Sequence, residues 1–278
     1  MGSEVVAVMT SSAAKDLRYV RHVVLDLDGT LYRGNRLFDV SIPFLDGLRS
    51  RGIGYTFLTN NTSRSKLDYV EKLKQLGIET HEDEIYTPAD STITYLREFL
   101  PKVKRIGVLG TPSLCQQFEQ AGLGVGWEGC EAVIVGFDTT LDYERLCRAA
   151  YGISLGLPYI ATHPDLVCPT DEPTVMVDCG AICACLSAAT NRTPVVLGKP
   201  DPGILIDLAH RHGLQPAELA MVGDRLYTDI AMAQRAGAIS VLVLSGEATA
   251  EEAAALSPPP DFVIQDVGEL GAMLPGAQ

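Results

Sequence analysis

The sequence contains no long apolar run and no excess of positive charge. No stretch approaches the roughly 18 consecutive apolar residues of a membrane-spanning helix. No basic segment precedes the short apolar run over 5–9, so we also expect no signal peptide. Acidic residues outnumber basic ones by 35 to 22, which gives a formal net charge of -13 at pH 7. Because such a surface repels nucleic-acid backbones and anionic membranes, we expect a cytoplasmic protein without nucleic-acid or membrane partners.

The sequence also lacks a regular cysteine framework. Seven cysteines among 278 residues give an odd number with no repeated spacing. A chain of this length needs no disulfides to hold its core, so a reducing compartment is expected. Three of the cysteines, Cys179, Cys183 and Cys185, fall in or beside an alanine-rich stretch that predicts a helix over 180–190. Small buried thiols explain this group more simply than a metal site does.

Hydrophobic runs alternate with helical patterns through most of the chain. The composition, with 46% hydrophobic and 21% charged residues, is typical of a globular protein. Strands separated by helices imply a doubly wound α/β fold with a parallel sheet. The sequence predicts strands over 23–27, 55–58, 106–109, 132–135, 159–161, 220–222 and 240–244, and helices over 43–51, 65–76, 112–121, 143–154, 180–190, 203–212 and 228–236.

The strongest local motif is Asp26-Leu27-Asp28-Gly29-Thr30, where the first predicted strand ends. Residues two apart in extended chain point the same way, so Asp26 and Asp28 are expected to project together beyond the carboxyl edge of the sheet. Ligands bind at that edge in open α/β folds. Two adjacent carboxylates repel each other, and Mg²⁺ accepts carboxylate and phosphate oxygens together. The alternative is an ordinary Asp-Gly turn with solvated acids.

A second motif, Thr59-Asn60-Asn61, follows the strand predicted over 55–58 and precedes a helix. The hydroxyls and amides of this motif and of the residues 62–65 that follow it can hold an anion beside the free N–H groups of the helix, or can simply cap the helix. A third signal is Lys199, in a loop after the apolar run 195–197. That lysine can neutralise phosphate charge, although an isolated loop lysine is more often solvated.

A fourth signal is Gly223-Asp224 at the end of the strand over 220–222, with Asp229 five residues after Asp224. A single Gly-Asp pair is weak, but all four signals follow apolar strand candidates. Each is therefore expected along one edge of one sheet. Together they supply a nucleophile, an acid, a hydroxyl, a cation and a further metal ligand, the groups that phosphoryl transfer through an aspartyl-phosphate requires.

The order of these motifs resembles that of the haloacid dehalogenase (HAD) superfamily, whose core is Rossmann-like. The long insertion between Asn61 and Lys199 resembles its type II cap, and the chain is similar to the subfamily IIA phosphatases, the NagD-like or 4-nitrophenylphosphatase-like group. The resemblance implies a core domain over 1–84 and 191–278, with a loose tail over 1–18, and an inserted α/β cap over 85–190. The narrower likeness rests on the stretches 28–34, 58–62, 135–138, 161–165, 196–200 and 222–230.

The resemblance implies a magnesium-dependent phosphatase of small phosphorylated metabolites. Asp26 is then the nucleophile and Asp28 the acid, which later activates water. Mg²⁺ is bound by the Asp26 side chain, the Asp28 carbonyl and Asp224, with support from Asp229. Phosphoryl oxygens are held by Thr59 and the amides near Asn60 and Asn61, and Lys199 neutralises charge on the nucleophile and the phosphate. A phosphotransferase or phosphomutase on the same scaffold, or a non-catalytic phosphate sensor, are the alternatives.

The cap is expected to select the substrate, and His163, Asp165 and Asp178 are the candidates for facing its leaving group. Many relatives have asparagine where this chain has His163, and a glycine-rich segment where it has 177–180. Alternatively, His163 only orders the loop before Pro164, and Asp178 only caps the helix over 180–190. The resemblance also suggests a homodimer formed through the cap.

Overall fold

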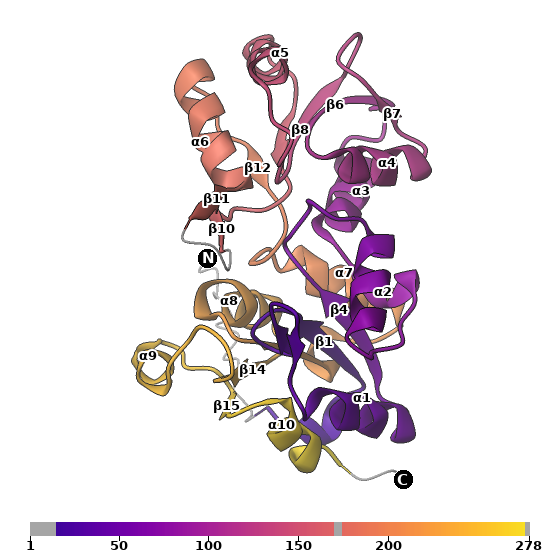
Figure 1. The fold of residues 1–278 in the computed structure, drawn as a ribbon, viewed down its shortest axis with the longest axis vertical. Helices are drawn as coiled ribbons and strands as arrows, with labels where there is room; N and C mark the ends of the chain where they lie inside the picture. Colours follow the sequence, from indigo (N-terminus) through magenta and orange to yellow (C-terminus); the bar gives the residue numbers. More distant parts are fainter. Residues whose placement is uncertain (1–14, 170–173, 276–278) are drawn as a thin grey trace, which may run out of the picture.

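The computed structural model describes residues 15–169 and 174–275, which form two α/β domains stacked along the long axis (Figure 1). The lower domain in that view, the core, is built on a six-stranded sheet in the order β15-β14-β13-β1-β4-β5, and all its neighbouring strands are parallel. Its strands are β1 (His22–Asp26), β4 (Gly54–Leu58), β5 (Ile85–Tyr86), β13 (Leu219–Gly223), β14 (Ile239–Val243) and β15 (Phe262–Ile264).

The upper domain, the cap, has its own parallel sheet of five strands in the order β12-β9-β8-β6-β7. These strands are β6 (Arg105–Leu109), β7 (Gly124–Val125), β8 (Ala132–Val135), β9 (Tyr159–Ala161) and β12 (Val195–Val196). Two antiparallel pairs complete the strands, β2 (Tyr32–Arg33) with β3 (Arg36–Leu37) in the core and β10 (Val167–Pro169) with β11 (Val175–Val177) in the cap.

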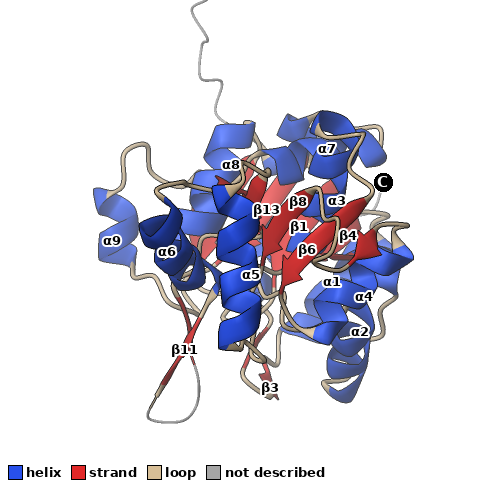
Figure 2. Ribbon diagram, turned by 90° about the horizontal axis from the view of Figure 1, so that it is seen from above, coloured by secondary structure: helices blue, strands red, loops and turns tan. Residues whose placement is uncertain are grey.

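Helices lie on both sides of the stacked sheets (Figure 2). In the core, alternate residues of β1 enter two separate clusters. Val23 and Leu25 pack on one face, and Val24 packs on the other. Both faces of the sheet are therefore buried, as the predicted doubly wound fold requires. The helices are α1 (Ser41–Ser50), α2 (Lys66–Gln75), α3 (Pro88–Phe99), α4 (Pro112–Gln120), α5 (Tyr143–Ser154), α6 (Cys179–Thr190), α7 (Gly203–Arg211), α8 (Ala231–Ala236), α9 (Ala250–Ala255) and α10 (Val267–Met273).

The predicted domain boundaries are a few residues off on both sides of the cap. The pair 85–86 was assigned to the cap, but as β5 it joins the core sheet beside β4. The pair 195–196 was assigned to the core, but as β12 it joins the cap sheet beside β9. Both errors have one cause: a two-residue strand carries no pattern of its own, and hydrogen bonds to a distant partner decide its sheet.

The predicted loose tail over 1–18 is also too long. Residues 1–14 lie outside the described part of the chain, but residues 15–18 already contact the core. Leu17 is buried in the core cluster, and Lys15 forms a 3.0 Å ion pair with Asp261. A short 3-10 helix, Leu17–Tyr19, begins at Asp16, whose carboxylate accepts a hydrogen bond from the backbone of Arg18. The folded chain therefore begins before residue 18.

The other predicted elements agree with the structure to within one or two residues, with one informative difference. The helix predicted over 228–236 begins instead as a π-helical turn, Leu226–Ile230, before α8. Helices α3, α9 and α10 were not predicted; α3 packs its buried Ala89 and Leu96 against residues of the cap sheet. Cys179 and Cys183 are buried as predicted, but Cys185 is exposed. Among the described residues, no helix is both long and apolar enough to cross a membrane.

Candidate active site

The first motif lies at the carboxyl end of β1, where the chain leaves the sheet in a tight turn. The amide of Gly29 donates to the Tyr32 carbonyl at 2.7 Å, and Gly29 has φ of +84°. A Cβ at Gly29 would lie 2.2 Å from Asp224 Oδ2, so glycine is required for the turn to approach that carboxylate. Asp28 Oδ2 accepts a 3.3 Å hydrogen bond from the amide of Gly34, while the partial burial of this carboxyl raises the pKa of Asp28.

Asp26 and Lys199 form an ion pair at the centre of the site. The Lys199 ammonium contacts Asp26 Oδ1 and lies 2.7 Å from Asp229 Oδ1, and all three side chains are largely buried. Burial by itself lowers the pKa of Lys199, but the carboxylates of Asp229 and Asp26 outweigh it and hold that pKa above its usual value. Lys199 is therefore a fixed positive charge beside Asp26.

The strand that precedes Lys199 belongs to a different sheet from the one that the sequence predicted. The apolar run before Lys199 was expected to be a strand of the same sheet as Asp26. It contributes β12 to the cap sheet instead, and Lys199 lies on the segment that returns from the cap to the core. The lysine still meets Asp26, because this segment crosses the carboxyl edge of the core sheet.

Asp224 follows β13, the neighbour of β1 in the sheet, and has one unsatisfied oxygen. Its Oδ2 accepts a 2.8 Å hydrogen bond from the amide of Glu247, whereas its buried Oδ1 has no hydrogen-bond partner within the described chain. Burial and the nearby Asp26 charge raise the pKa of Asp224 to about 6. A buried carboxylate oxygen without a donor is a ready ligand for a cation.

Asp229 is fully buried beneath this group, and its two oxygens have protein contacts. Oδ1 pairs with Lys199, and Oδ2 accepts a 3.1 Å hydrogen bond from the amide of Arg225. Burial raises the pKa of Asp229 to about 7. One oxygen of each of Asp26, Asp224 and Asp229 lies within 4.8 Å of the others, so their geometry suits one metal ion.

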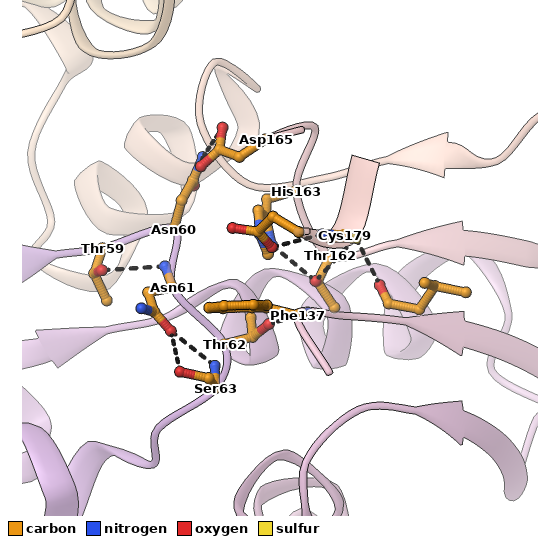
Figure 3. Close-up of polar contacts among 12 residues, drawn as sticks. Thr59, Asn60, Asn61, Thr62, Ser63, Phe137, Thr162, His163, Asp165 and Cys179 are labelled. Carbon is orange, nitrogen blue, oxygen red and sulfur yellow. Dashed lines mark hydrogen bonds and ion pairs between the residues drawn. The ribbon is translucent and has the colours of Figure 1, made fainter. Parts of the chain in front are cut away.

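Thr59 and Asn61 (Figure 3) follow β4, whose last residue, Leu58, pairs with Asp26 at the end of β1. Thr59 Oγ1 accepts from the Asn61 amide at 3.2 Å and lies 3.3 Å from the Tyr69 hydroxyl. The Asn61 side-chain oxygen accepts from the amide and the hydroxyl of Ser63, which fixes the turn. The following helix, α2, is capped by Ser65. Helix capping, the alternative considered for this segment, is thus performed by Ser65 and not by Thr59 or Asn61.

The Asn60 side chain does not face the site as expected for a substrate contact. Its Oδ1 accepts from the Lys199 amide at 2.8 Å, and its Nδ2 donates to the Lys199 carbonyl at 3.0 Å. The same Nδ2 lies 3.3 Å from Asp165 Oδ2, in the cap. Protein groups thus occupy both ends of the amide, and the expected substrate contact of this side chain is corrected to a contact with Lys199.

Comparison with known proteins identifies the family of this site. The family model described as haloacid dehalogenase-like hydrolase matches residues 23–124, and a second, described as HAD-hydrolase-like, matches residues 196–270. The acid sugar phosphatase of Staphylococcus aureus is 32% identical over 259 residues, which cover 93% of this chain and 99% of that protein. The chain belongs to the haloacid dehalogenase-like hydrolases.

Similarity to solved structures identifies the subfamily to which the chain belongs. A 4-nitrophenylphosphatase from Thermotoga maritima is 39% identical, with a TM-score of 0.87 and coverage of 92% of this chain and 98% of that one. A glycerol phosphate phosphatase from Mycobacterium tuberculosis, solved in complex with magnesium, is 30% identical, with a TM-score of 0.85 and coverage of 94% and 80%. The chain is thus a phosphoric monoester hydrolase of subfamily IIA, the NagD-like group with a HAD core and a cap.

Two of the three cap candidates of this phosphatase lie inside the cap rather than over the site. His163 is fully buried. One ring nitrogen lies 2.8 Å from Asp178 Oδ1 and the other 3.0 Å from Thr162 Oγ1. Asp178 is the N-cap of α6. The expected contact of these two side chains with a leaving group is therefore corrected to the alternative, in which they order the cap. Asp165 is partly exposed at the junction with the core.

Two residues that hold the phosphatase site together, Gly246 and Tyr69, were not predicted from the sequence. Gly246 lies so close that a Cβ there would be 2.0 Å from Asp224 Oδ2, and the next amide, of Glu247, binds that oxygen. A signal was available, because Ser245-Gly246 follows the strand predicted over 240–244. Tyr69, which contacts Thr59, gave no such signal, because a tyrosine on the apolar face of a helix reads as part of the core.

Proposed function

We propose that this phosphatase is magnesium-dependent and hydrolyses small phosphate monoesters through an aspartyl-phosphate on Asp26. The observation that carries the proposal is the pairing of Asp26 with the buried Lys199, beside an Asp224 oxygen that has no donor. An ionised carboxylate held at the open edge of a parallel sheet is a suitable nucleophile. The lysine offsets the charge that accumulates when an anionic nucleophile meets an anionic ester.

The protein groups around Asp26 have distinct roles in this proposal. Asp26 attacks phosphorus as the bond to the leaving oxygen breaks, and Asp28 donates a proton to that oxygen. Partial burial raises the pKa of Asp28, which favours the protonated form that an acid needs. Asp28 then accepts a proton from the water that hydrolyses the aspartyl-phosphate. Thr59 and the amides near Asn60 and Asn61 hold the phosphoryl oxygens.

The residues present suit a divalent cation. Asp26 and Asp224 would bind Mg²⁺ through carboxylate oxygens, Asp28 through its main-chain carbonyl, and Asp229 would support them. The buried, unsatisfied Oδ1 of Asp224 and the close approach of three carboxylates are the features that support this assignment. When bound, the ion would neutralise charge on the phosphoryl group and on these carboxylates.

The proposed substrates are compact phosphorylated metabolites. The names of similar proteins indicate sugar phosphates and glycerol phosphate, together with the artificial ester 4-nitrophenyl phosphate. Nucleoside monophosphates and phosphoglycolate are further candidates from the family resemblance. The formal charge of -13 is consistent with a small ester drawn in by a local site rather than with a polyanion.

The test is phosphate release from a panel of these esters and from 4-nitrophenyl phosphate, with Mg²⁺ and with excess chelator. We expect turnover of 4-nitrophenyl phosphate with Mg²⁺ and its loss on chelation. Absence of hydrolysis at every metal concentration would instead support a phosphate sensor. Transfer of the phosphoryl group to an added alcohol or sugar, in place of free phosphate, would support a phosphotransferase or phosphomutase.

We also propose that two copies associate through the cap. The supporting feature is β12, an edge strand of the cap sheet whose Val195 and Val196 are both exposed. An apolar edge strand readily pairs with another chain unless it is covered. Light scattering after size exclusion tests this proposal: a dimer that Val196→Lys converts to a monomer supports it, and a monomeric wild-type protein overturns it.

A further inference from the structure

The Asn60 amide holds the backbone of Lys199 at two points. The Lys199 N–H donates to Asn60 Oδ1 at 2.8 Å, and the Lys199 carbonyl accepts from Nδ2 at 3.0 Å. Asn60 and Lys199 are 139 positions apart and come from different segments of the core. Because the amide forms hydrogen bonds with both main-chain groups of Lys199, it fixes the position of the Lys199 Cα, from which the side chain extends.

The contacts of the preceding residue, Gly198, also restrict the position of the Lys199 backbone. Gly198 has φ of +74°, and a Cβ on it would lie 2.6 Å from the Thr162 carbonyl, 2.9 Å from His163 Cβ and 3.0 Å from Asn60 Oδ1. The end of the cap strand β9, the Asn60 loop and the returning segment are thus in contact at one point. A shift of Asn60 would move the backbone of Lys199, and with it the ammonium group between Asp26 and Asp229.

Asp165 links this contact to the cap. Asn60 Nδ2 lies 3.4 Å and 3.3 Å from the two Asp165 oxygens (Figure 3). The Asp165 carbonyl accepts a 2.8 Å hydrogen bond from Gly180 in the first turn of α6. A Cβ at Gly180 would lie 2.1 Å from the Pro164 carbonyl, so the loop and the helix are packed backbone to backbone. Asp165 is therefore held by the cap while its carboxylate contacts the core.

We propose that Asn60 is a positioning residue that sets the place of the Lys199 ammonium beside the nucleophile, and that Asp165 couples this placement to the seating of the cap. The proposal rests on the proposed function, since it assumes that Lys199 serves phosphoryl transfer from Asp26. It gives the asparagine after Thr59 a role through Lys199 rather than through the substrate. It also gives Asp165 a role at the junction that His163 and Asp178 do not share.

The experiment measures kcat and KM on 4-nitrophenyl phosphate, with thermal unfolding as the check on folding. Asn60→Ala is expected to lower kcat about tenfold to a hundredfold, the scale of a misplaced catalytic group, and to change KM much less. Asn60→Asp retains the acceptor for the Lys199 amide but loses the donor, and its charge repels Asp165. We expect it to lose activity too while folding normally, so it replaces Asn60→Ala should that variant not fold.

A double-mutant cycle separates positioning from a general loss of structure. In a Lys199→Ala background, Asn60→Ala is expected to lower kcat by less than about threefold more, because groups that act as a unit are not additive. Should Lys199→Ala have no measurable turnover, Lys199→Arg supplies the background. Additive losses, or an unchanged kcat in folded Asn60→Ala, would overturn the proposal.

The role of Asp165 is tested with a matched control at another contact between core and cap. Asp165→Ala should lower kcat about twofold to tenfold and should not add to Asn60→Ala, since both act on one group. The control is Lys66→Met, which removes the 2.8 Å ion pair between α2 and Asp90 of α3 and does not touch Lys199. Its kcat is expected to stay within about twofold of wild type.

Equal losses of kcat in Asp165→Ala and Lys66→Met would show that any weakened contact between core and cap lowers kcat, and would overturn the proposed coupling through Asp165.

Failure of the proposed function gives a different result. In that case the wild-type protein does not hydrolyse 4-nitrophenyl phosphate, or a variant without the Asp26 carboxylate retains turnover.

Discussion

The core and the cap each contain a tight group of side chains of the types that can bind metals, and the two groups differ in the hydrogen-bond partners of their atoms. In the core, oxygens of Asp26, Asp224 and Asp229 lie within 4.8 Å of one another. In the cap, ligand atoms of His163, Asp165 and Asp178 meet the same limit. Close approach alone therefore does not distinguish a metal site from a structural cluster.

The hydrogen-bond partners of the two groups distinguish a candidate metal site from a structural cluster. Both ring nitrogens of His163 have protein partners, Asp178 caps α6, and Asp165 contacts Asn60. In the core, Asp224 retains a buried oxygen without a donor. Carboxylates that repel one another and lack donors destabilise the fold unless a ligand compensates for them. The core group is thus arranged for a ligand, and the cap group for holding a loop against a helix.

The largest effect is expected from Asp26→Asn, which removes the nucleophile and preserves the shape of the side chain. Turnover of 4-nitrophenyl phosphate should fall by roughly 10⁴-fold or more, as when the nucleophile of other hydrolases is removed. The measurement is steady-state release of 4-nitrophenolate with Mg²⁺. Full activity of the purified, folded variant would contradict the assignment of the core group to catalysis.

Asp28→Asn is expected to have the second-largest effect. General acid and base help accounts for about 10²- to 10⁴-fold in rate, so kcat should fall within that range. Esters with good leaving groups need the acid least, so 4-nitrophenyl phosphate should retain more turnover than glycerol phosphate. An equal loss on both esters would show that Asp28 does not protonate the leaving oxygen.

Metal removal should distinguish the two groups through stability as well as activity. Mg²⁺ at about 100 times its Kd is expected to stabilise the fold by about 2.7 kcal/mol, measured by thermal unfolding with and without chelator. Asp224→Asn should weaken this response, whereas His163→Ala should retain it. Equal responses in both variants would mean that the core group is not the metal site.

The response to Mg²⁺ should also depend on pH. Without metal, burial raises the pKa of Asp224 to about 6 and that of Asp229 to about 7. Both values lie above those of an unfolded chain, so the folded state binds more protons than the unfolded state does. The metal-free protein therefore loses stability as pH rises through this range. Because Mg²⁺ displaces the same protons, its stabilising effect should grow from pH 5 to pH 8.

The smallest effect on activity is expected from His163→Ala, although the sequence made His163 a candidate for facing the leaving group. Its burial changes that expectation. The variant leaves Asp178 without its 2.8 Å partner, so the free energy of unfolding should fall by about 1–3 kcal/mol. Activity on 4-nitrophenyl phosphate should stay within a few-fold of wild type. The matched control is His210→Ala on the exposed face of α7, expected to change stability by less than about 0.5 kcal/mol.

Local pattern was enough to locate most of the fold. Strand β8 and helix α5 have the predicted bounds, because continuous apolar runs and a helical repeat are properties of neighbouring residues. Strands β5 and β12 were assigned to the wrong domains, because their two residues acquire strand geometry only from a distant partner. The π-helical start of the segment before α8 was missed for a similar reason: Asp229 must reach Lys199, and no local pattern records that contact.

By itself, the sequence determined which residues stand where the core strands end, since a strand followed by Asp26, Thr59 or Asp224 is a local pattern and parallel strands share one carboxyl edge. Only the tertiary structure decided what those residues touch. Lys199 meets Asp26 across 173 positions and Asn60 across 139. It also decided that His163 is buried and that Asp224 retains an unsatisfied oxygen. Such contacts depend on how two domains pack, and side-chain hydrogen bonds between distant segments leave no periodic mark in a sequence.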